Sequence, residues 1–291
     1  MNKADIRKVI SQSILADGMS PIIDLEKSHG SWLVDKVSGK EYLDLFSMFA
    51  SLSVGYNHPY VLEQSERLRI AAINKPTNSD VYSQEMAEFM DTFKRVAQPD
   101  YLPHTFFIEG GGLAVENALK VAFDWKRRKN LAKGSSAKGE KVIHFKQCFH
   151  GRTGYTMSLT DSPDKRKTMY FHKFDWPRVT NPKITFPLKD NLEHVKELER
   201  KSLHEIKEAI AANPDNIASI ILEPIQGEGG DNHFRCEFMQ SLREIADEND
   251  IMLIYDEVQT GVGVTGKMWA HQHFATTECK TCDCEDGLAA K

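Results

Sequence analysis

Two acidic residues, Asp256 and Glu257, directly follow the uncharged, mostly apolar run 251–255. A short apolar run without polar alternation is typical of a strand buried on both faces of a parallel sheet. In open α/β sheets, ligands bind beyond the carboxyl ends of the strands, so Asp256 stands where a ligand would meet it. A buried carboxylate needs a positive partner, and a pyridinium ring, a magnesium ion or an arginine would each supply one. A purely structural acid is the alternative.

A run of glycines, Gly110 to Gly112, separates the apolar segment 104–109 from a segment with helical spacing. A bare backbone lets an anion approach closely, and a helix N-terminus offers unpaired N–H groups and the positive end of the helix dipole. A tight turn that needs glycine only for its dihedral angles is the alternative. Three consecutive glycines exceed what such a turn needs, so an anion site is favoured. The spacing predicts that one face of this helix is apolar, with Ala114, Ala118, Val121 and Trp125.

Two more predicted strands end in residues that could bind a ligand. Segment 141–146 is followed by Phe149 and Arg152, and an aromatic ring beside a basic residue and glycines can stack on a flat ligand. Phe149 as an ordinary core residue is the alternative. The apolar run from Ser219 leads into Glu223 and then into a glycine-rich loop. Together, these strand ends suit a flat, anionic cofactor with a ring nitrogen.

Such a site requires strands that end at one edge of a sheet. The predicted strands lie at 104–109, 141–146, 183–187, 219–225 and 251–255. The predicted helices lie at 61–73, 83–97, behind the glycine run, and at 190–212 and 236–248. Alternation of strands and helices predicts a mostly parallel α/β sheet. Short antiparallel strands are predicted between residues 21 and 46, and 129–140 is predicted to be a polar linker.

Net charge, the lengths of apolar runs and the spacing of cysteines restrict which classes of protein the sequence fits. The 291 residues carry a formal net charge of −5, which gives no electrostatic reason to expect nucleic-acid or anionic-membrane partners. The first ten residues lack the apolar core of a signal peptide, and no run is long enough to cross a bilayer, so a cytoplasmic protein is expected. The spacing of Cys279, Cys282 and Cys284 matches neither a disulfide framework nor a common zinc module. A zinc site with His271 or His273 as the fourth ligand and a polar tail with incidental thiols are the two alternatives for these cysteines.

The stretch Gly261-Val-Gly-Val-Thr-Gly266-Lys267 fits the phosphate-binding loop of nucleotide hydrolases up to its last position. Met268 then stands where a serine or threonine should hold magnesium. The stretch also trails the acidic strand end, whereas such a loop should precede it. A nucleotide hydrolase is therefore the less favoured alternative.

Four stretches resemble one known family. They are Phe106-Phe-Ile-Glu-Gly-Gly-Gly-Leu-Ala-Val-Glu-Asn-Ala-Leu-Lys120, Cys148-Phe-His-Gly-Arg-Thr-Gly154, Glu223-Pro-Ile-Gln-Gly-Glu-Gly-Gly-Asp231 and Asp256-Glu-Val-Gln-Thr-Gly261. With them, the chain from about Ile6 to Phe274 resembles the class III aminotransferases, which use pyridoxal phosphate, and most of all those that act on L-lysine as 6-aminotransferases. The resemblance implies a fold-type I large domain, incomplete here, with a mostly parallel sheet and a small N-terminal α+β segment. It also implies a homodimer.

The same resemblance divides the chain and assigns its cofactor site. Residues 1–60 would belong to the small domain, 61–274 to the pyridoxal-phosphate-binding large domain, and 275–291 to an unrelated polar tail that contains the cysteines. The implied cofactor contacts are the phosphate at Gly111 and Gly112, the ring face at Phe149, the ring surroundings at Glu223, the ring nitrogen at Asp256 and the phenolic oxygen at Gln259. An acid beside the ring nitrogen keeps the pyridine protonated and able to accept electrons.

The resemblance further implies that the terminal amino group of L-lysine moves to 2-oxoglutarate, giving glutamate and 2-aminoadipate 6-semialdehyde. Arg152 would bind the α-carboxylate of the substrate, because arginine can bond a carboxylate through two N–H groups. Glu228 would let one arginine of the site face either lysine or 2-oxoglutarate.

One departure from the family bears on activity. The catalytic lysine of the family, which forms the Schiff base, follows the aspartate on the next strand, and no lysine of this chain stands in that register. Lys267 belongs to the preceding glycine loop, and Lys280 and Lys291 lie in the unrelated tail. We therefore expect a truncated, inactive aminotransferase; a frameshift, an incomplete gene and a genuine short form all fit. A non-catalytic remnant that binds cofactor or a partner is the alternative function.

Overall fold

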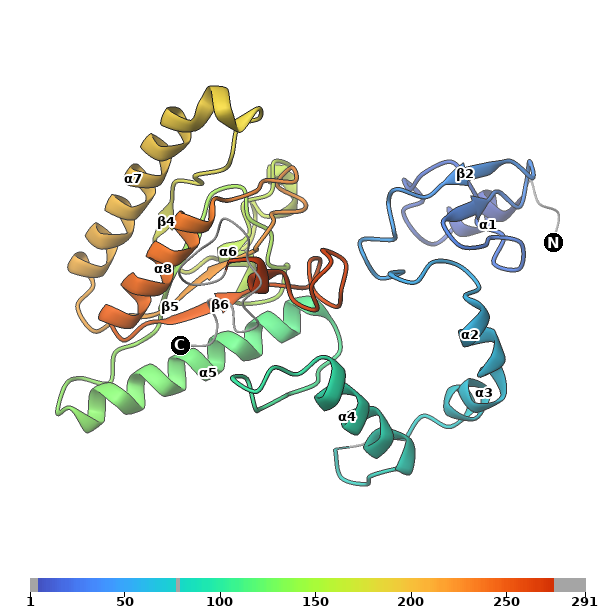
Figure 1. The fold of residues 1–291 in the computed structure, drawn as a ribbon, viewed down its shortest axis with the longest axis horizontal. Helices are drawn as coiled ribbons and strands as arrows, with labels where there is room; N and C mark the ends of the chain where they lie inside the picture. Colours follow the sequence, from blue (N-terminus) through green and yellow to red (C-terminus); the bar gives the residue numbers. More distant parts are fainter. Residues whose placement is uncertain (1–4, 77–78, 275–291) are drawn as a thin grey trace. The chain divides into compact units, whose positions relative to one another are not determined.

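The computed structural model describes residues 5–76 and 79–274. The chain divides into two compact units, Met1–Thr92 and Phe93–Lys291, which are described separately (Figure 1). No helix in the described ranges is both long and apolar enough to cross a membrane.

The first unit contains a small antiparallel sheet and short helices. Its strands pair with Trp32 opposite Leu43, which confirms the antiparallel prediction. The carboxylate of Asp35 holds the turn between them, since it accepts hydrogen bonds from the Ser38 N–H (2.9 Å) and the Ser38 hydroxyl (2.5 Å). The elements are α1 (Ile6–Ile10), β1 (Trp32–Val34), β2 (Glu41–Leu43), α2 (Pro59–Glu63), α3 (Ser65–Ile73) and the start of α4 (Gln84–Val96).

The second unit is built on a parallel sheet. Its four strands lie in the order β4-β3-β5-β6, and every neighbouring pair is parallel, as the alternation of strands and helices predicted. Their bounds are β3 (Lys141–Phe145), β4 (Arg178–Val179), β5 (Ile217–Leu222) and β6 (Met252–Tyr255). The remaining elements are α5 (Gly111–Ala132), α6 (Thr156–Leu159), η2 (Lys165–Lys167), α7 (Leu188–Ala212), α8 (Cys236–Glu248) and η3 (Ala270–His273).

Helices cover both faces of this sheet (Figure 1). Alternate side chains of a strand point to opposite faces, so Ile143 and Phe145 join the core formed with α7 and α8. Val142, which precedes Ile143 and points to the opposite face, packs with α5 in a second core cluster. Every residue of β5 is buried. This burial explains why the β5 sequence reads as a continuous apolar run.

Three strand predictions need correction. Segment 104–109 is not a strand, because no described strand pairs with it, and Phe106 is 70% exposed. Segment 183–187 is not a strand either, since Pro182 precedes it and Pro187 ends it, and both lack N–H donors. The strand in this region is β4. The strand β6 is only partly buried, because in the described chain it pairs on one side, with β5 alone.

The face that α5 turns to the core is also not the predicted one. Val121 of the predicted face is 62% exposed, whereas Leu119 is fully buried. Two apolar stripes run along this helix one residue apart, and their spacing is the same, so periodicity alone did not distinguish them. The buried stripe is Val115, Leu119, Ala122, Lys126 and Asn130. The predicted linker 129–140 begins too early, because α5 continues to Ala132.

Candidate functional site

Three loops meet at the carboxyl ends of the strands. A Cβ atom on Gly112 would lie 3.2 Å from the Thr153 methyl carbon, and one on Gly151 would lie 2.9 Å from the Gly112 Cα atom. A Cβ atom on Gly111 would lie 2.9 Å from both methyl carbons of Val258. The start of α5 therefore contacts both the loop after β3 and the loop after β6. At Gly151, where a Cβ atom would meet backbone and φ is +104°, only glycine allows so close an approach.

The N-terminus of α5 offers donors at this point. Ala114 makes the first backbone bond of the helix, to the Gly110 carbonyl oxygen. Within the described residues, no acceptor bonds the N–H groups of Gly111 or Gly112. Unpaired N–H groups at the positive end of a long helix bind anions such as phosphate. This geometry supports the anion site predicted from the glycine run.

Asp256 is buried at the end of β6, as predicted, and it has a partner that the sequence analysis missed. Its Oδ2 atom lies 2.7 Å from the Nδ1 atom of His150, with side-chain exposures of 5% and 0%. Its Oδ1 atom accepts the N–H of Val258 at 3.2 Å. Burial opposes the charged imidazolium, but Cys148 and the Asp256 carboxylate raise the pKa of His150 well above its usual value. The only sequence signal for this pair was the position of His150, which directly follows Phe149, the residue expected to stack on the ring.

Glu223 lies buried at the end of β5, next to the same loops. Its two oxygens accept the N–H groups of Phe149 (2.8 Å) and Gly227 (3.2 Å), so one carboxyl group ties the loop after β3 to the loop after β5. Burial raises the pKa of Glu223 to about 7. The nearby charge of His150 opposes this shift and that of Asp256 adds to it.

Gln259 lies against the glycine-rich loop after β5. A Cβ atom on Gly227 would stand 1.6 Å from the Gln259 Oε1 atom, so this contact requires glycine. The neighbouring Gln226, which sequence analysis did not select, is fully buried and orients the loop. Its amide accepts from Asn181 (2.7 Å) and Asn232 (2.9 Å). Phe149 is only partly buried, which leaves ring surface for stacking.

The two predicted substrate residues differ in their surroundings. Arg152 is exposed and makes no hydrogen bond or ion pair within the described chain. Glu228 accepts the ammonium of Lys167 at 2.9 Å and the hydroxyl of Ser162 at 3.1 Å, both on its Oε1 atom. No pattern in the sequence singles out Ser162 or Lys167.

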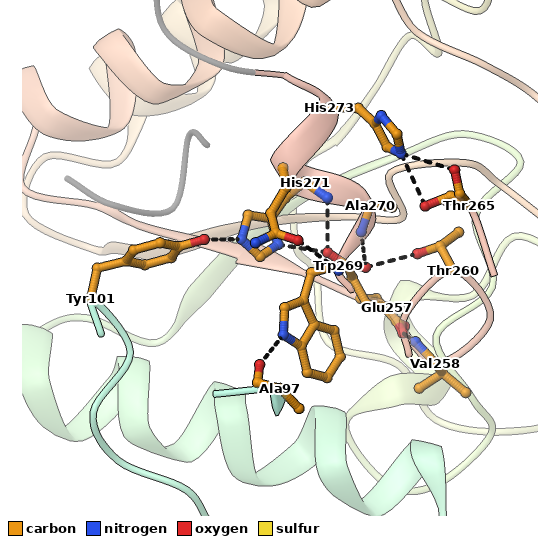
Figure 2. A network of polar contacts seen from close by, with 12 residues as sticks. Ala97, Tyr101, Glu257, Val258, Thr260, Thr265, Trp269, Ala270, His271 and His273 are labelled. Atoms are coloured by element: carbon orange, nitrogen blue, oxygen red, sulfur yellow. Dashed lines mark hydrogen bonds and ion pairs between the residues drawn. The ribbon is translucent and has the colours of Figure 1, made fainter. Parts of the chain in front are cut away.

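A buried polar network connects the loop after β6 to η3 and to the segment 97–101 (Figure 2). The Oε1 atom of Glu257 lies 2.6 Å from Nδ1 of His271, and its Oε2 atom accepts the N–H of Ala270 at 2.6 Å. The Nε2 atom of His271 lies 2.8 Å from the Tyr101 hydroxyl, and the Trp269 indole donates to the Ala97 carbonyl at 2.6 Å. Glu257 therefore holds η3 against the strand end that presents Asp256.

The structure disfavours two alternative sites, a phosphate-binding loop at 261–267 and a zinc site. Segment 261–267 forms turns that lead to the four-residue η3, not to the long helix that a phosphate-binding loop precedes. His271 and His273, considered as zinc ligands beside the cysteines, bond Glu257 and Thr265. The three cysteines at 279, 282 and 284, like Lys280 and Lys291, lie outside the described residues.

The arrangement suits a ligand with an anionic group at one end and a cationic ring nitrogen elsewhere. The free N–H groups of α5 match the anion, and the buried Asp256 carboxylate matches the cation. Glycines where a Cβ atom would collide keep the loops close around this space. The residues present therefore fit a flat phosphorylated pyridine.

Comparison with known proteins agrees with this chemistry. The sequence profile described as aminotransferase class-III matches residues 14–279. The chain is 49% identical to the L-lysine-epsilon aminotransferase of Mycobacterium tuberculosis over 92% of its length and 46% identical to that of Amycolatopsis lactamdurans over 93%. It spans 60% of the length of both. The solved lysine aminotransferase from M. tuberculosis in the internal aldimine form superposes with a TM-score of 0.90 at 47% identity, covering 95% of this chain and 64% of the other, which confirms the fold-type I expectation.

Proposed function

The chain belongs to the class III aminotransferase family, whose members use pyridoxal phosphate, and we propose that it binds this cofactor. We further propose that it acts in the transfer of the terminal amino group of L-lysine to 2-oxoglutarate. Relatives at 46–49% identity are named L-lysine-epsilon aminotransferases, which supports the choice of amino donor. The acceptor, the products glutamate and 2-aminoadipate 6-semialdehyde, the homodimer and a cytoplasmic location are parts of the same proposal.

One observation carries the cofactor proposal: the buried Asp256–His150 pair joins the loops after β3 and β6, and these two loops contact the start of α5 with its free N–H groups. The N–H groups of Gly111 and Gly112 would hold the phosphate. Asp256 would retain the proton on the ring nitrogen, and His150 would keep the carboxylate in place. Pyridoxal phosphate, when bound, supplies the electron sink for the substrate's carbanion.

The other site residues would orient the cofactor and its substrates. Phe149 would stack on the ring and Gln259, fixed against Gly227, would bond its phenolic oxygen. Glu223 would hold the two loops that surround the ring. Arg152 would bind the substrate α-carboxylate, and its freedom from other partners in the described chain suits that role.

Catalysis further needs a lysine that bonds the cofactor covalently. Lys267 lies in the turns between Gly261 and η3 and does not stand in the family register. We therefore propose that Lys267 does not bond the cofactor, which the described residues would hold through noncovalent contacts alone. A non-catalytic cofactor-binding chain is the second candidate function.

Cofactor titration tests the proposal. The fluorescence change on adding pyridoxal phosphate is expected to saturate for the wild-type chain. Asp256→Asn should bind at least about tenfold more weakly, because the ring nitrogen loses its anionic partner. Asp124→Asn, on the exposed side of α5, is the matched control and should bind as the wild type does. Equal affinity of wild type and Asp256→Asn, or no saturable binding, would overturn the proposal.

A further inference from the structure

The imidazole of His150 has a ring nitrogen that Asp256 does not satisfy. Its Nδ1 atom lies 2.7 Å from Asp256, whereas its buried Nε2 atom bonds no nitrogen or oxygen of the described residues. Burial opposes a charged imidazole, but Cys148 and the Asp256 carboxylate raise the pKa of His150 well above its usual value, so both ring nitrogens carry a proton. A buried, charged N–H group is costly without an acceptor.

The thiol of Cys148 is placed to accept this N–H group. Cys148 is 1% exposed, and its S–H group donates to the Leu159 carbonyl oxygen at 3.0 Å. A thiol that has donated its single proton keeps its sulfur lone pairs for an incoming donor. The Cys148 side chain also interacts directly with the imidazole of His150.

Backbone contacts hold the thiol and the imidazole in place. The Cys148 carbonyl oxygen accepts the N–H of Asp161 at 2.8 Å. The backbone N–H of His150 donates to the Thr160 hydroxyl at 3.0 Å. Both residues are therefore tied to the segment 159–161, which also supplies the carbonyl oxygen that orients the thiol.

We propose that Cys148 is a positioning residue: its sulfur accepts the Nε2–H group of His150 and so completes a buried chain from Cys148 through His150 to Asp256. The effect of this chain on the cofactor rests on the proposed function. Two cations, His150 and the ring nitrogen, would then share the Asp256 carboxylate. By keeping His150 charged, Cys148 would limit how tightly Asp256 holds the proton on the ring nitrogen.

His144 and Glu223 also face this imidazole, and their titration has to be separated from its own. Burial, helped by the charges of Arg178 and His150, lowers the pKa of His144 to about 3, so His144 stays neutral near physiological pH. Burial raises the pKa of Glu223 to about 7, within the range of interest. The Glu223→Gln background removes that titration.

The test measures the pKa of His150 by ¹⁵N NMR of its ring nitrogens, in the full chain without cofactor and in the Glu223→Gln background. Cys148→Ala should lower this pKa by about one pH unit, because the charged form loses an acceptor. Cys148→Ser should keep it near the wild-type value, since a hydroxyl also donates to Leu159 and accepts from Nε2. Val142→Ala removes buried volume from the cluster with α5 and should not change it. An unchanged pKa in Cys148→Ala, or an equal fall in Cys148→Ser, would overturn the role of Cys148.

A second measurement, with cofactor bound, separates this inference from the proposed function. The ring nitrogen of ¹⁵N-labelled pyridoxal phosphate should keep its proton to higher pH in Cys148→Ala than in the wild type, because a less charged His150 competes less for Asp256. If the pKa of His150 falls but the ring nitrogen titrates as in the wild type, the effect on the cofactor is overturned. If the wild-type chain binds no pyridoxal phosphate, the proposed function falls, while the pKa of His150 still decides whether Cys148 positions it.

Discussion

Replacing Glu223 with glutamine should change how the stability of the chain depends on pH. Burial raises the pKa of this carboxyl from 4.5 to about 7, so the folded chain holds the proton more tightly than the unfolded chain does. The free energy of unfolding therefore falls as pH rises from about 4.5 to about 7 and is level above that. This rise in the pKa of Glu223 corresponds to about 3 kcal/mol of stability in total.

Urea unfolding of wild type and Glu223→Gln at pH 5 and pH 8 measures this effect. About 2.5 kcal/mol of the loss in the free energy of unfolding falls between pH 5 and pH 8, because a small part of the titration of Glu223 occurs below pH 5. Glutamine does not titrate, so the stability of the wild type relative to the variant should drop by that amount at pH 8. Titrating groups that do not interact with Glu223 cancel in the comparison. Parallel pH profiles for the two proteins would refute the buried, protonated state of Glu223.

Three further substitutions probe the site. Gly227→Ala should displace Gln259 and weaken cofactor binding about tenfold in a fluorescence titration, because the new Cβ atom would overlap the Gln259 amide oxygen. Gly154→Ala is the control and should bind the cofactor normally, because the nearest atom to its new Cβ atom would lie 3.5 Å away. His150→Phe should leave the buried Asp256 carboxylate without its partner and reduce cofactor affinity by a similar factor in the same titration; unchanged affinity would remove His150 from the site. Glu257→Ala should lower the free energy of unfolding, measured in urea, by about 3 kcal/mol, because the N–H groups of Ala270 and His271 lose their acceptor. A loss below about 1 kcal/mol would show that the network in Figure 2 is dispensable.

The sequence predicted elements whose signal is local. The helix α8 begins at Cys236 and ends at Glu248, as its spacing indicated. Strands β3 and β5 read as apolar runs because both of their faces are covered. Strand β4 has only two residues and no such run, so it could not be found. Segment 104–109 has the composition of a strand, but a strand forms only where a neighbour supplies backbone partners.

The candidate site was predictable only as far as its loops carry recognisable residues. The resemblance selected Asp256, Gln259 and the glycines, and the structure brings their loops into contact. It did not reveal His150 or Lys167, because pairing with a residue distant in sequence leaves no local pattern. The Lys167–Glu228 contact joins residues 61 positions apart. Such pairs become visible only when the loops converge.

The protonation state of the ring nitrogen tests the central claim most directly. Pyridoxal phosphate labelled with ¹⁵N in the ring, bound to the wild-type chain at neutral pH, should give the nitrogen chemical shift of a protonated pyridine, because the buried Asp256 carboxylate holds the proton there. In Asp256→Asn the shift should move to that of the neutral ring. A neutral ring in the wild type, or a protonated ring in the variant, would contradict the account.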